Sequence, residues 1–419
     1  ALRLLHLSVA DRLRDGGRGR GLGHSAGWLR QILVLTQVAL TLVVLVAAGL
    51  LTRSLREVEN ADLGFTNRDV LLATANLPDQ RFPTAEQRVT AIQKLQDLAS
   101  GFPGVDGAAV INIAPFSGAD NGAIINVLGR PEGEPMPVAS IRHVSANYFS
   151  TLGIPLLRGR LLTEADRANS QPVAVIDSHL AETYWPNQDP LGQQFVYGDE
   201  ELTFEVVGIA KHMRHDGLQP SHPQEGFIYI PLAQEPQEVV NLLVDSVLPQ
   251  ESLAPMLRGL IEDLAPEMPV EVRSLPALIR RANAGFSTPA RLSEGMALLA
   301  ALLAAVGIYS LIAVMVRSRA REIGIRLTLG SRRRQILALL TRRALLLVAG
   351  GIVAGLVLSW WLGKLYLQTW SQLLYRTSPH DPLTYAAVSV LFLALALLAS
   401  WIPSRRALRI DPAQTLREE

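Results

Sequence analysis

The sequence predicts a membrane protein with four transmembrane α-helices and one large α+β domain outside the membrane. The chain of 419 residues is 49% hydrophobic and only 18% charged, and its mean hydropathy of +0.22 is above the usual value for soluble domains. Four apolar runs carry no charged residue, and each is long enough, at ~1.5 Å per residue, to cross the roughly 30 Å core of a bilayer. Helices buried in a soluble core rarely run this long without a polar face. The runs are Ile32–Leu51, Met296–Val316, Ala344–Leu362 and Leu383–Ile402.

The net charge of +1 conceals a separation of charge along the chain. Residues 57–290 hold 15 basic and 30 acidic side chains, whereas the rest of the chain holds 24 basic and 8 acidic ones. Arginines concentrate before the first run, between the second and third runs, and after the fourth. Because cytoplasmic flanks of spans are enriched in Arg and Lys, both termini are expected in the cytoplasm of a bacterium. Residues 53–290 are then expected outside the inner membrane, and no basic surface suggests nucleic-acid binding.

Residues 53–290 alternate between strand-like and helix-like patterns, which predicts a folded α+β domain. A helix is expected over Thr84–Ser100, because Thr84 and Gln87 have the spacing of a capping box. A strand followed by a short helix is expected around Asp177, with Asp177 or Ser178 as the N-cap. The other expected elements are strands at Val70–Leu77, Val105–Ile113, Ala123–Leu128, Gln193–Tyr197, Leu202–Ile209, Phe227–Pro231, Val239–Val244 and Val270–Arg273, and a helix at Ser252–Leu264.

Motifs for catalysis are absent from the sequence. It has no G-x-x-x-x-G-K-[ST] phosphate loop, no G-x-S-x-G and no H-E-x-x-H, and it has no cysteine. One cluster, His212, His215 and His222 with Asp216, could bind a metal. Its glycines and prolines favour the alternative, solvated histidines of a loop. The sequence therefore predicts no catalytic residue, no cofactor and no metal, and a protein that is not an enzyme.

Small residues recur at four-residue spacing in two of the apolar runs. Small side chains let membrane helices approach closely, so we expect these faces to pack against other helices rather than to be apolar filler. They are Gly351, Gly355 and Ser359 in the third run, and Ala297, Ala301 and Ala305 in the second.

The segment 317–343 joins the second and third spans and is dense in arginine. Gly330 and Ser331 supply a helix break and a new N-cap within a short basic amphipathic element. One interpretation is an anionic-lipid contact that fixes topology. The other is a lever moved by a cytoplasmic partner.

Within this segment, the run from Arg321 to Ile336, REIGIRLTLGSRRRQI, resembles the signature loop of the FtsX-like, MacB-type permeases. The phrase VSANYFSTLGIPLLRGR, from Val144 to Arg160, is similar to their periplasmic core domain. The opening and closing phrases, Leu13–Gly19 and Arg409–Arg417, are similar to the linker and terminus of acidobacterial-type duplicated orphan permeases. This resemblance implies that the chain is the C-terminal half of such a permease.

The resemblance implies a permease subunit of an ABC transporter that works by mechanotransmission in export or efflux. A separate cytoplasmic ABC ATPase would move the 317–343 loop, and the helices would pass that motion to the external domain. Further implied partners are a second permease copy (a homodimer or the other half of a duplicated chain), membrane lipids and a periplasmic adaptor. The residues expected to couple to the ATPase are Arg321, Glu322, Gly324, Arg326 and Gly330.

Two alternatives remain open at this point. One is a membrane-anchored sensor or interaction protein whose external domain binds a ligand without ATP-driven work. The other is a membrane-tethered hydrolase. The expected organisation is a basic N-terminal segment at 1–31, a first span at 32–52, the external domain at 53–290, a second span at 291–316, the coupling loop at 317–343, two spans at 344–402 (permease domain 291–402) and a tail at 403–419.

Overall fold

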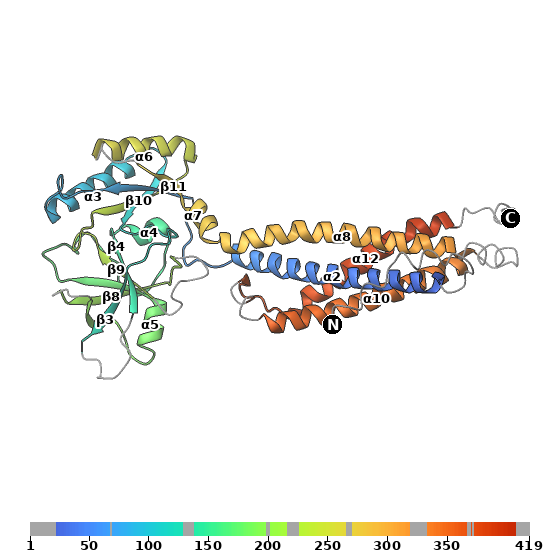
Figure 1. Cartoon of the computed structure of the whole chain (residues 1–419). Coiled ribbons are helices and arrows are strands. Elements are labelled where there is room, and N and C mark those ends of the chain that lie inside the picture. Colours follow the sequence, from blue (N-terminus) through green and yellow to red (C-terminus); the bar gives the residue numbers. More distant parts are fainter. Residues whose placement is uncertain are drawn as a thin grey trace, which may run out of the picture. The chain divides into compact units, whose positions relative to one another are not determined.

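The computed structural model describes residues 22–67, 69–128, 138–197, 202–215, 226–264, 270–318, 333–366, 370 and 373–407. The chain divides into two compact units. The α+β unit is Asn60–Ala284, and the helical unit combines Ala1–Glu59 with Gly285–Glu419. Figure 1 shows both units and labels many of their helices and strands.

The helical unit contains four long helices, and each includes one of the apolar runs expected from the sequence. Each helix is long and apolar enough to cross a membrane, judged by length and composition. The helices continue past the apolar runs, because a backbone already in helical hydrogen bonds can extend into water with polar side chains. They are α2 (Leu22–Glu59), α8 (Ala284–Ser318), α10 (Arg333–Leu365) and α12 (Pro382–Ala407).

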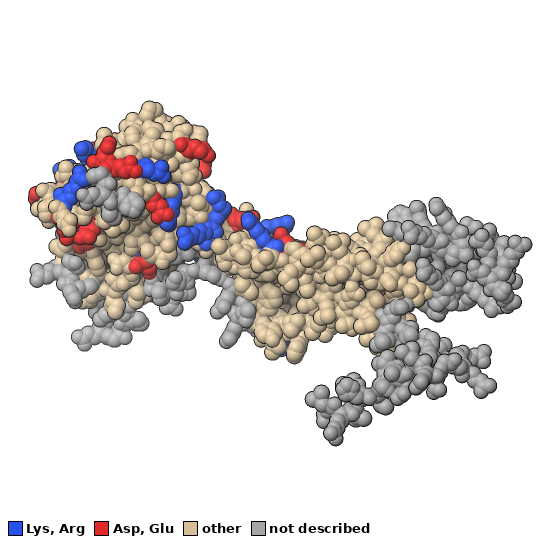
Figure 2. Space-filling model, turned by 45° about the horizontal axis from the view of Figure 1, so that its top comes forward, with Lys and Arg blue, Asp and Glu red and all other residues tan. Residues whose placement is uncertain are grey.

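The core of the helical unit is assembled around one face of α2, which packs against the other three helices. Buried side chains of α2 include Val38, Leu42 and Val46, and they meet Ile308 of α8 and Phe392 of α12 in a single cluster. Outside this cluster, α8 exposes large apolar side chains such as Leu298, Leu302 and Val306. Figure 2 shows most of the visible described surface of this unit without charged side chains, whereas patches of both charges are scattered over the α+β unit. An apolar, uncharged exterior is what lipid requires of a spanning helix.

The described residues of the α+β unit form one mixed sheet with helices packed on it. The strand order is β11-β1-β10-β2-β4-β3-β7-β8-β6-β9, with β5 paired to β8 and β4 also paired to β9. The strands are β1 (Val70–Asn76), β2 (Val105–Ile111), β3 (Gly122–Val127), β4 (Val138–Val144), β5 (Leu156–Gly159), β6 (Val173–Asp177), β7 (Gln194–Tyr197), β8 (Phe204–Ala210), β9 (Gly226–Pro231), β10 (Val239–Ser246) and β11 (Val272–Ser274). The helices are α3 (Ala85–Ser100), α4 (Tyr148–Leu152), α5 (Ser178–Tyr184), α6 (Gln250–Leu264) and α7 (Leu275–Ala282).

Two separate hydrophobic cores divide this unit into two lobes. The first lobe packs α3 and α6 against β1, β2 and β10, around residues such as Leu95 and Leu257. The second lobe packs α5 against β3, β4 and β6 to β9, around residues such as Phe195 and Phe204. Strands β2 and β4 join the two parts of the sheet through one register pair, Ile111 and Val144. A groove between the lobes can therefore form beside this narrow junction.

The N-terminal caps that the sequence predicts for two helices, α3 and α5, are confirmed in the structure. The Thr84 side chain accepts a hydrogen bond from the Gln87 backbone N–H at 3.2 Å, so Thr84 caps α3. Asp177, rather than Ser178, caps α5, because its Oδ1 accepts from the Leu180 N–H at 2.8 Å.

Four elements of the fold were not expected from the sequence: β4, β5, α4 and α7. Strand β4 was hidden by Arg142 and His143, two polar residues that are fully or almost fully buried in the fold. Arg142 donates to Asp120 at 2.9 Å, and His143 Nε2 lies 2.8 Å from Glu235 Oε2. These acidic partners are distant in sequence, so hydropathy alone gives no sign that the pairs can be buried together.

Candidate functional site

Helices α10 and α2 approach each other closely at two of the small residues singled out from the sequence. A Cβ added at Gly351 would lie 2.5 Å from Val38 Cγ1, and one at Gly355 would lie 2.8 Å from the Ala39 carbonyl oxygen. Real Cβ atoms do not approach other atoms so closely, so glycine is required for this packing. Ser359 is buried one turn further on, where its hydroxyl donates to the Gly355 carbonyl at 2.8 Å.

Helix α8 contains the alanines expected to pack against another helix, and their packing role stays a prediction. Ala297 is buried, and Ala301 and Ala305 are half-buried. The direct links come from α2, where Gln37 donates to the Leu303 carbonyl at 2.7 Å. Gly307 makes room for this amide, since a Cβ there would lie 2.5 Å from Gln37 Oε1. A contact by Gln37 was not expected from the sequence, although Gln37 is the one side-chain amide in the run Ile32–Leu51.

Three consecutive residues near the end of α2 bind three different parts of the helical unit. Thr52 donates to Glu294 of α8 at 2.8 Å, and Arg53 forms an ion pair with Asp381, the residue preceding α12, at 2.5 Å. The Ser54 hydroxyl accepts a hydrogen bond from the Tyr375 backbone N–H at 2.7 Å. This group, which we call the Thr52–Ser54 cluster, ties α2 to the segments around it beyond the apolar run.

The residues expected to couple to an ATPase lie outside the described residues. They belong to the stretch of sequence between the end of α8 at Ser318 and the start of α10 at Arg333. These residues are Arg321, Glu322, Gly324, Arg326 and Gly330, and their role in coupling stays a prediction.

Two of the three clustered histidines lie in the α+β unit with different partners. His212 Nδ1 pairs with the buried Asp177 carboxylate, and His215 Nε2 lies 3.1 Å from the Tyr229 hydroxyl. Burial, with the nearby positive charge of Arg142, lowers the pKa of His215 well below 6.5, so the ring is neutral. In the parts of the chain that the structure describes, no group of three His, Cys, Asp or Glu is placed to hold a metal. His222 and Asp216 lie outside those parts.

Two family models match successive parts of this chain. The family model of the MacB-like periplasmic core domain matches residues 33–257, and that of the FtsX-like permease C-terminal region matches residues 295–412. The first match alone spans more than half of the chain. The chain belongs to the family of MacB-like and FtsX-like permeases. This permease is accordingly a multi-pass membrane protein with a periplasmic-core domain.

Curated relatives of this permease are named for export. It is 25% identical over 288 residues to "Macrolide export ATP-binding/permease protein MacB 2" of Aeromonas hydrophila, covering 67% of this chain and 43% of the relative. It is 24% identical over 368 residues to "Pyoverdine export ATP-binding/permease protein PvdT" of Pseudomonas fluorescens, covering 86% and 52%. The chain therefore spans about half the length of the curated relatives it matches.

Among solved structures, the periplasmic region of MacB from Actinobacillus actinomycetemcomitans is similar to this permease at 15% identity, with a TM-score of 0.37. The match covers 55% of this chain and 97% of that one.

Proposed function

We propose that this chain is the permease subunit of a MacB/FtsX-type ABC transporter that works by mechanotransmission in export. A separate cytoplasmic ATPase would supply the free energy, because the sequence contains no phosphate-binding loop of its own. The relatives' names join an ATP-binding part and a permease part in one protein, which supports a partner of this kind. The membrane helices would act as levers that move the α+β unit.

The observation that carries this proposal is the way the α+β unit is joined to the spans. Asn283 alone separates α7, which packs on β1 and β11, from the membrane helix α8. On the other side, the segment that follows α2 buries Leu63 and Phe65, and the Leu63 carbonyl accepts from the Arg214 N–H at 3.0 Å. Anchored connectors transmit a displacement, whereas flexible linkers absorb it.

The distribution of arginine supports an orientation with both termini and the 317–343 loop in the cytoplasm. The α+β unit would then lie outside the inner membrane, where a periplasmic adaptor could reach it. A second permease copy, either a homodimer partner or the other half of a duplicated chain, would complete the membrane assembly. The ATPase would dock on Arg321, Glu322, Gly324, Arg326 and Gly330, which match the signature loop of the family.

The docking step is tested by co-purification with a candidate ATPase and by measuring its stimulated hydrolysis. Glu322→Lys and Gly324→Trp are expected to abolish both complex formation and stimulation. Arg417→Glu in the C-terminal tail is the control charge reversal, and it should leave both unchanged. If complex and stimulation survive the two loop substitutions, the coupling proposal is wrong, and the alternative of a membrane-anchored sensor is favoured.

The lever step is tested separately by weakening one connector. Insertion of the four residues Gly-Ser-Gly-Ser after Asn283 should leave ATPase binding intact but abolish the ATP-dependent motion of the α+β unit. The chain has no cysteine, so spin labels on cysteines introduced at Val306 of α8 and Leu98 of α3, both exposed, report the distance cleanly. The same insertion after the exposed Asn187 is the matched control, and it should preserve the ATP-dependent change in the distance between the two spin labels. An unchanged ATP response in the first insertion variant would refute the lever.

A further inference from the structure

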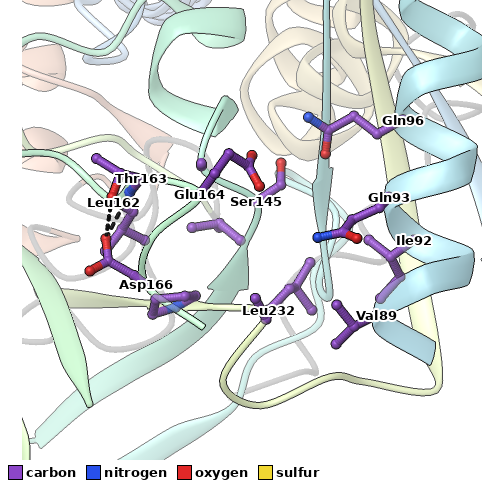
Figure 3. Close-up of a pocket in the computed structure, with 14 residues that line it drawn as sticks. Val89, Ile92, Gln93, Gln96, Ser145, Leu162, Thr163, Glu164, Asp166 and Leu232 are labelled. Carbon is purple, nitrogen blue, oxygen red and sulfur yellow. Dashed lines mark hydrogen bonds between the residues drawn. The ribbon is translucent and has the colours of Figure 1, made fainter. Parts of the chain in front are cut away.

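The α+β unit contains a pocket at an open edge of strand β2. This strand pairs with β4 only at Ile111, so its first residues have no described strand beside them on that side. Residues 105–108 of this open edge line the pocket together with α4 and the end of α3. The pocket holds about 350 Å³, a usual size for sites that bind small organic ligands. The groove between the two lobes, which Figure 3 shows, holds only about 40 Å³, room for no more than a few water molecules.

The lining of this pocket is mostly polar, and among its described residues none is basic or aromatic. A ligand without polar groups would leave such a lining desolvated and unpaired, so the composition favours a hydrophilic ligand. The polar lining residues are Asn67, Ser100, Asp106, Asn147, Ser150, Thr151 and Asp245, and the others are Val105, Gly107 and Ala108.

The two carboxylates of the lining, Asp106 and Asp245, form no ion pair within the described part of the chain. Asp245 accepts one hydrogen bond, from Asn67 Nδ2 to Oδ2 at 2.8 Å. Burial, followed by the like charges of Asp106 and Asp69, raises the pKa of Asp245 above its usual value. A cation bound beside the two carboxylates would relieve this repulsion. A metal ion is disfavoured, because no group of three His, Cys, Asp or Glu among the described residues is placed to hold one.

Thr151 of α4 places an unpaired hydroxyl in the same pocket. The residue is only 3% exposed and lines the pocket, yet its hydroxyl makes no hydrogen bond to the described residues. Buried hydroxyls are normally paired, because an unmade hydrogen bond leaves their desolvation uncompensated. Gly107 keeps the space beside this hydroxyl open, since a Cβ there would lie 3.2 Å from Thr151 Oγ1. A ligand with a hydroxyl group would complete the pairing.

Two asparagines prepare the pocket for such a ligand. Asn147 is the N-cap residue of α4, a position where Asn usually accepts a hydrogen bond from the helix, but its side chain makes no capping bond. Its amide therefore stays available to the pocket that it lines. Asn67 Nδ2 donates both to the Thr151 carbonyl at 2.9 Å and to Asp245 Oδ2 at 2.8 Å. This bridge holds the carboxylate and α4 together, so the site is formed before a ligand arrives.

We propose that this pocket binds a small ammonium compound that carries hydroxyl groups, of the amino-sugar class. The ammonium group would lie beside Asp106 and Asp245, and the hydroxyl groups would pair with Thr151 and Asn147. This binding goes beyond the proposed transport function and requires neither ATP nor an ATPase, so it stands or fails independently of the coupling and lever tests.

The experiment uses the full chain in lipid nanodiscs and the probe glucosamine, with the dissociation constant measured by saturation-transfer NMR titration. Glucose tests the charge, because it has the same ring without the ammonium group. Cyclohexylamine tests the hydroxyl groups, because it carries the ammonium group on a six-membered ring without them. Glucosamine is expected to bind about tenfold more tightly than either control, a difference of about 1.4 kcal/mol. Calcium chloride at the same concentration tests for a metal site and should not displace glucosamine.

Two substitutions and their matched controls locate the site. Asp245→Asn and Thr151→Val should each weaken glucosamine binding by about three- to tenfold. Thr151→Val retains the fold, because it exchanges an unpaired hydroxyl for a methyl group of similar size, and it should leave cyclohexylamine binding unchanged. The controls Asp263→Asn on α6 and Thr90→Val on α3 make the same chemical changes at exposed positions outside the pocket. They should leave the affinity for glucosamine unchanged.

A third substitution tests the sign of the ligand's charge. Arg68 lies outside the described residues and is the one basic residue adjacent in sequence to a residue of the lining. Since the ligand is a cation, Arg68→Gln should keep or tighten glucosamine binding. The proposal is overturned if glucosamine does not bind, if glucose or cyclohexylamine binds equally well, or if calcium displaces it. It is also overturned if both pocket variants keep the wild-type affinity, or if Arg68→Gln abolishes binding.

Discussion

Replacing Gly355 by alanine should force α10 away from α2. The added Cβ would lie 2.8 Å from the Ala39 carbonyl oxygen and 2.9 Å from Leu42 Cβ and Cδ2. The first contact is with backbone, which cannot rotate aside, so the helices must separate. Overpacking of this kind typically costs about 1–3 kcal/mol. The gain in helix propensity from Gly to Ala offsets about 1 kcal/mol of that cost, which leaves a net loss of up to about 2 kcal/mol.

Gly350 provides a matched control on the same helix. A Cβ at this position would have Leu35 Cδ1 as its nearest neighbour, at 3.8 Å, which is ordinary van der Waals contact. Gly350→Ala therefore gains the same helix propensity without a clash, and should be neutral or stabilising by up to about 1 kcal/mol. The difference between the two variants isolates the α2–α10 contact, because the propensity contribution cancels.

The assay is thermal or denaturant unfolding of the two variants and the wild type in the same detergent. We expect Gly355→Ala to unfold at a lower temperature than Gly350→Ala by a margin that corresponds to about 1–3 kcal/mol. Equal stability of the two alanine variants would show that α10 and α2 do not pack as described. That result would also remove the physical basis for treating these helices as a rigid lever.

Three further changes test other contacts. Gln37→Leu removes the hydrogen bond from α2 to α8 and should lower the free energy of unfolding by about 0.6–1.7 kcal/mol in the same assay. Thr36→Val, at an exposed position of the same helix, is the control and should leave the stability unchanged. Equal stability of the two variants would rule out the interhelical hydrogen bond. Arg53→Met breaks the half-exposed ion pair with Asp381 and should cost only about 0.2–1 kcal/mol, with the effect reduced at high salt; a larger loss would mean the pair is more buried than described. The pKa of His215 lies well below 6.5 in the folded state, so the unfolded chain binds more protons at this residue. The free energy of unfolding should therefore fall as the pH drops through 6.5, by up to about 1.4 kcal/mol per pH unit. His215→Gln should flatten that slope, and an unchanged slope would contradict a neutral buried ring.

Polar groups buried in the fold show where prediction from sequence stops. Arg142 and His143 interrupt the apolar pattern of β4, and their neutralising partners, Asp120 and Glu235, come from other parts of the chain. Hydrogen bonds from His143 and Tyr197 keep the pKa of Glu235 below its usual value, although burial alone would raise it. No local pattern reveals such a balance, because it depends on which strands become neighbours.

The sequence by itself determined the features that depend on local physics. The thickness of a bilayer sets the length of an uncharged run, so the four spans were visible as composition, and the cap at Thr84 depends on hydrogen bonds within one turn. Only the tertiary structure decided which faces meet: that Gly351 and Gly355 admit α2, and that α3 and the loop from Leu162 to Asp166 line the same groove (Figure 3). These features join residues that are distant in the chain, and their energies come from packing and charge pairing that a one-dimensional pattern does not contain.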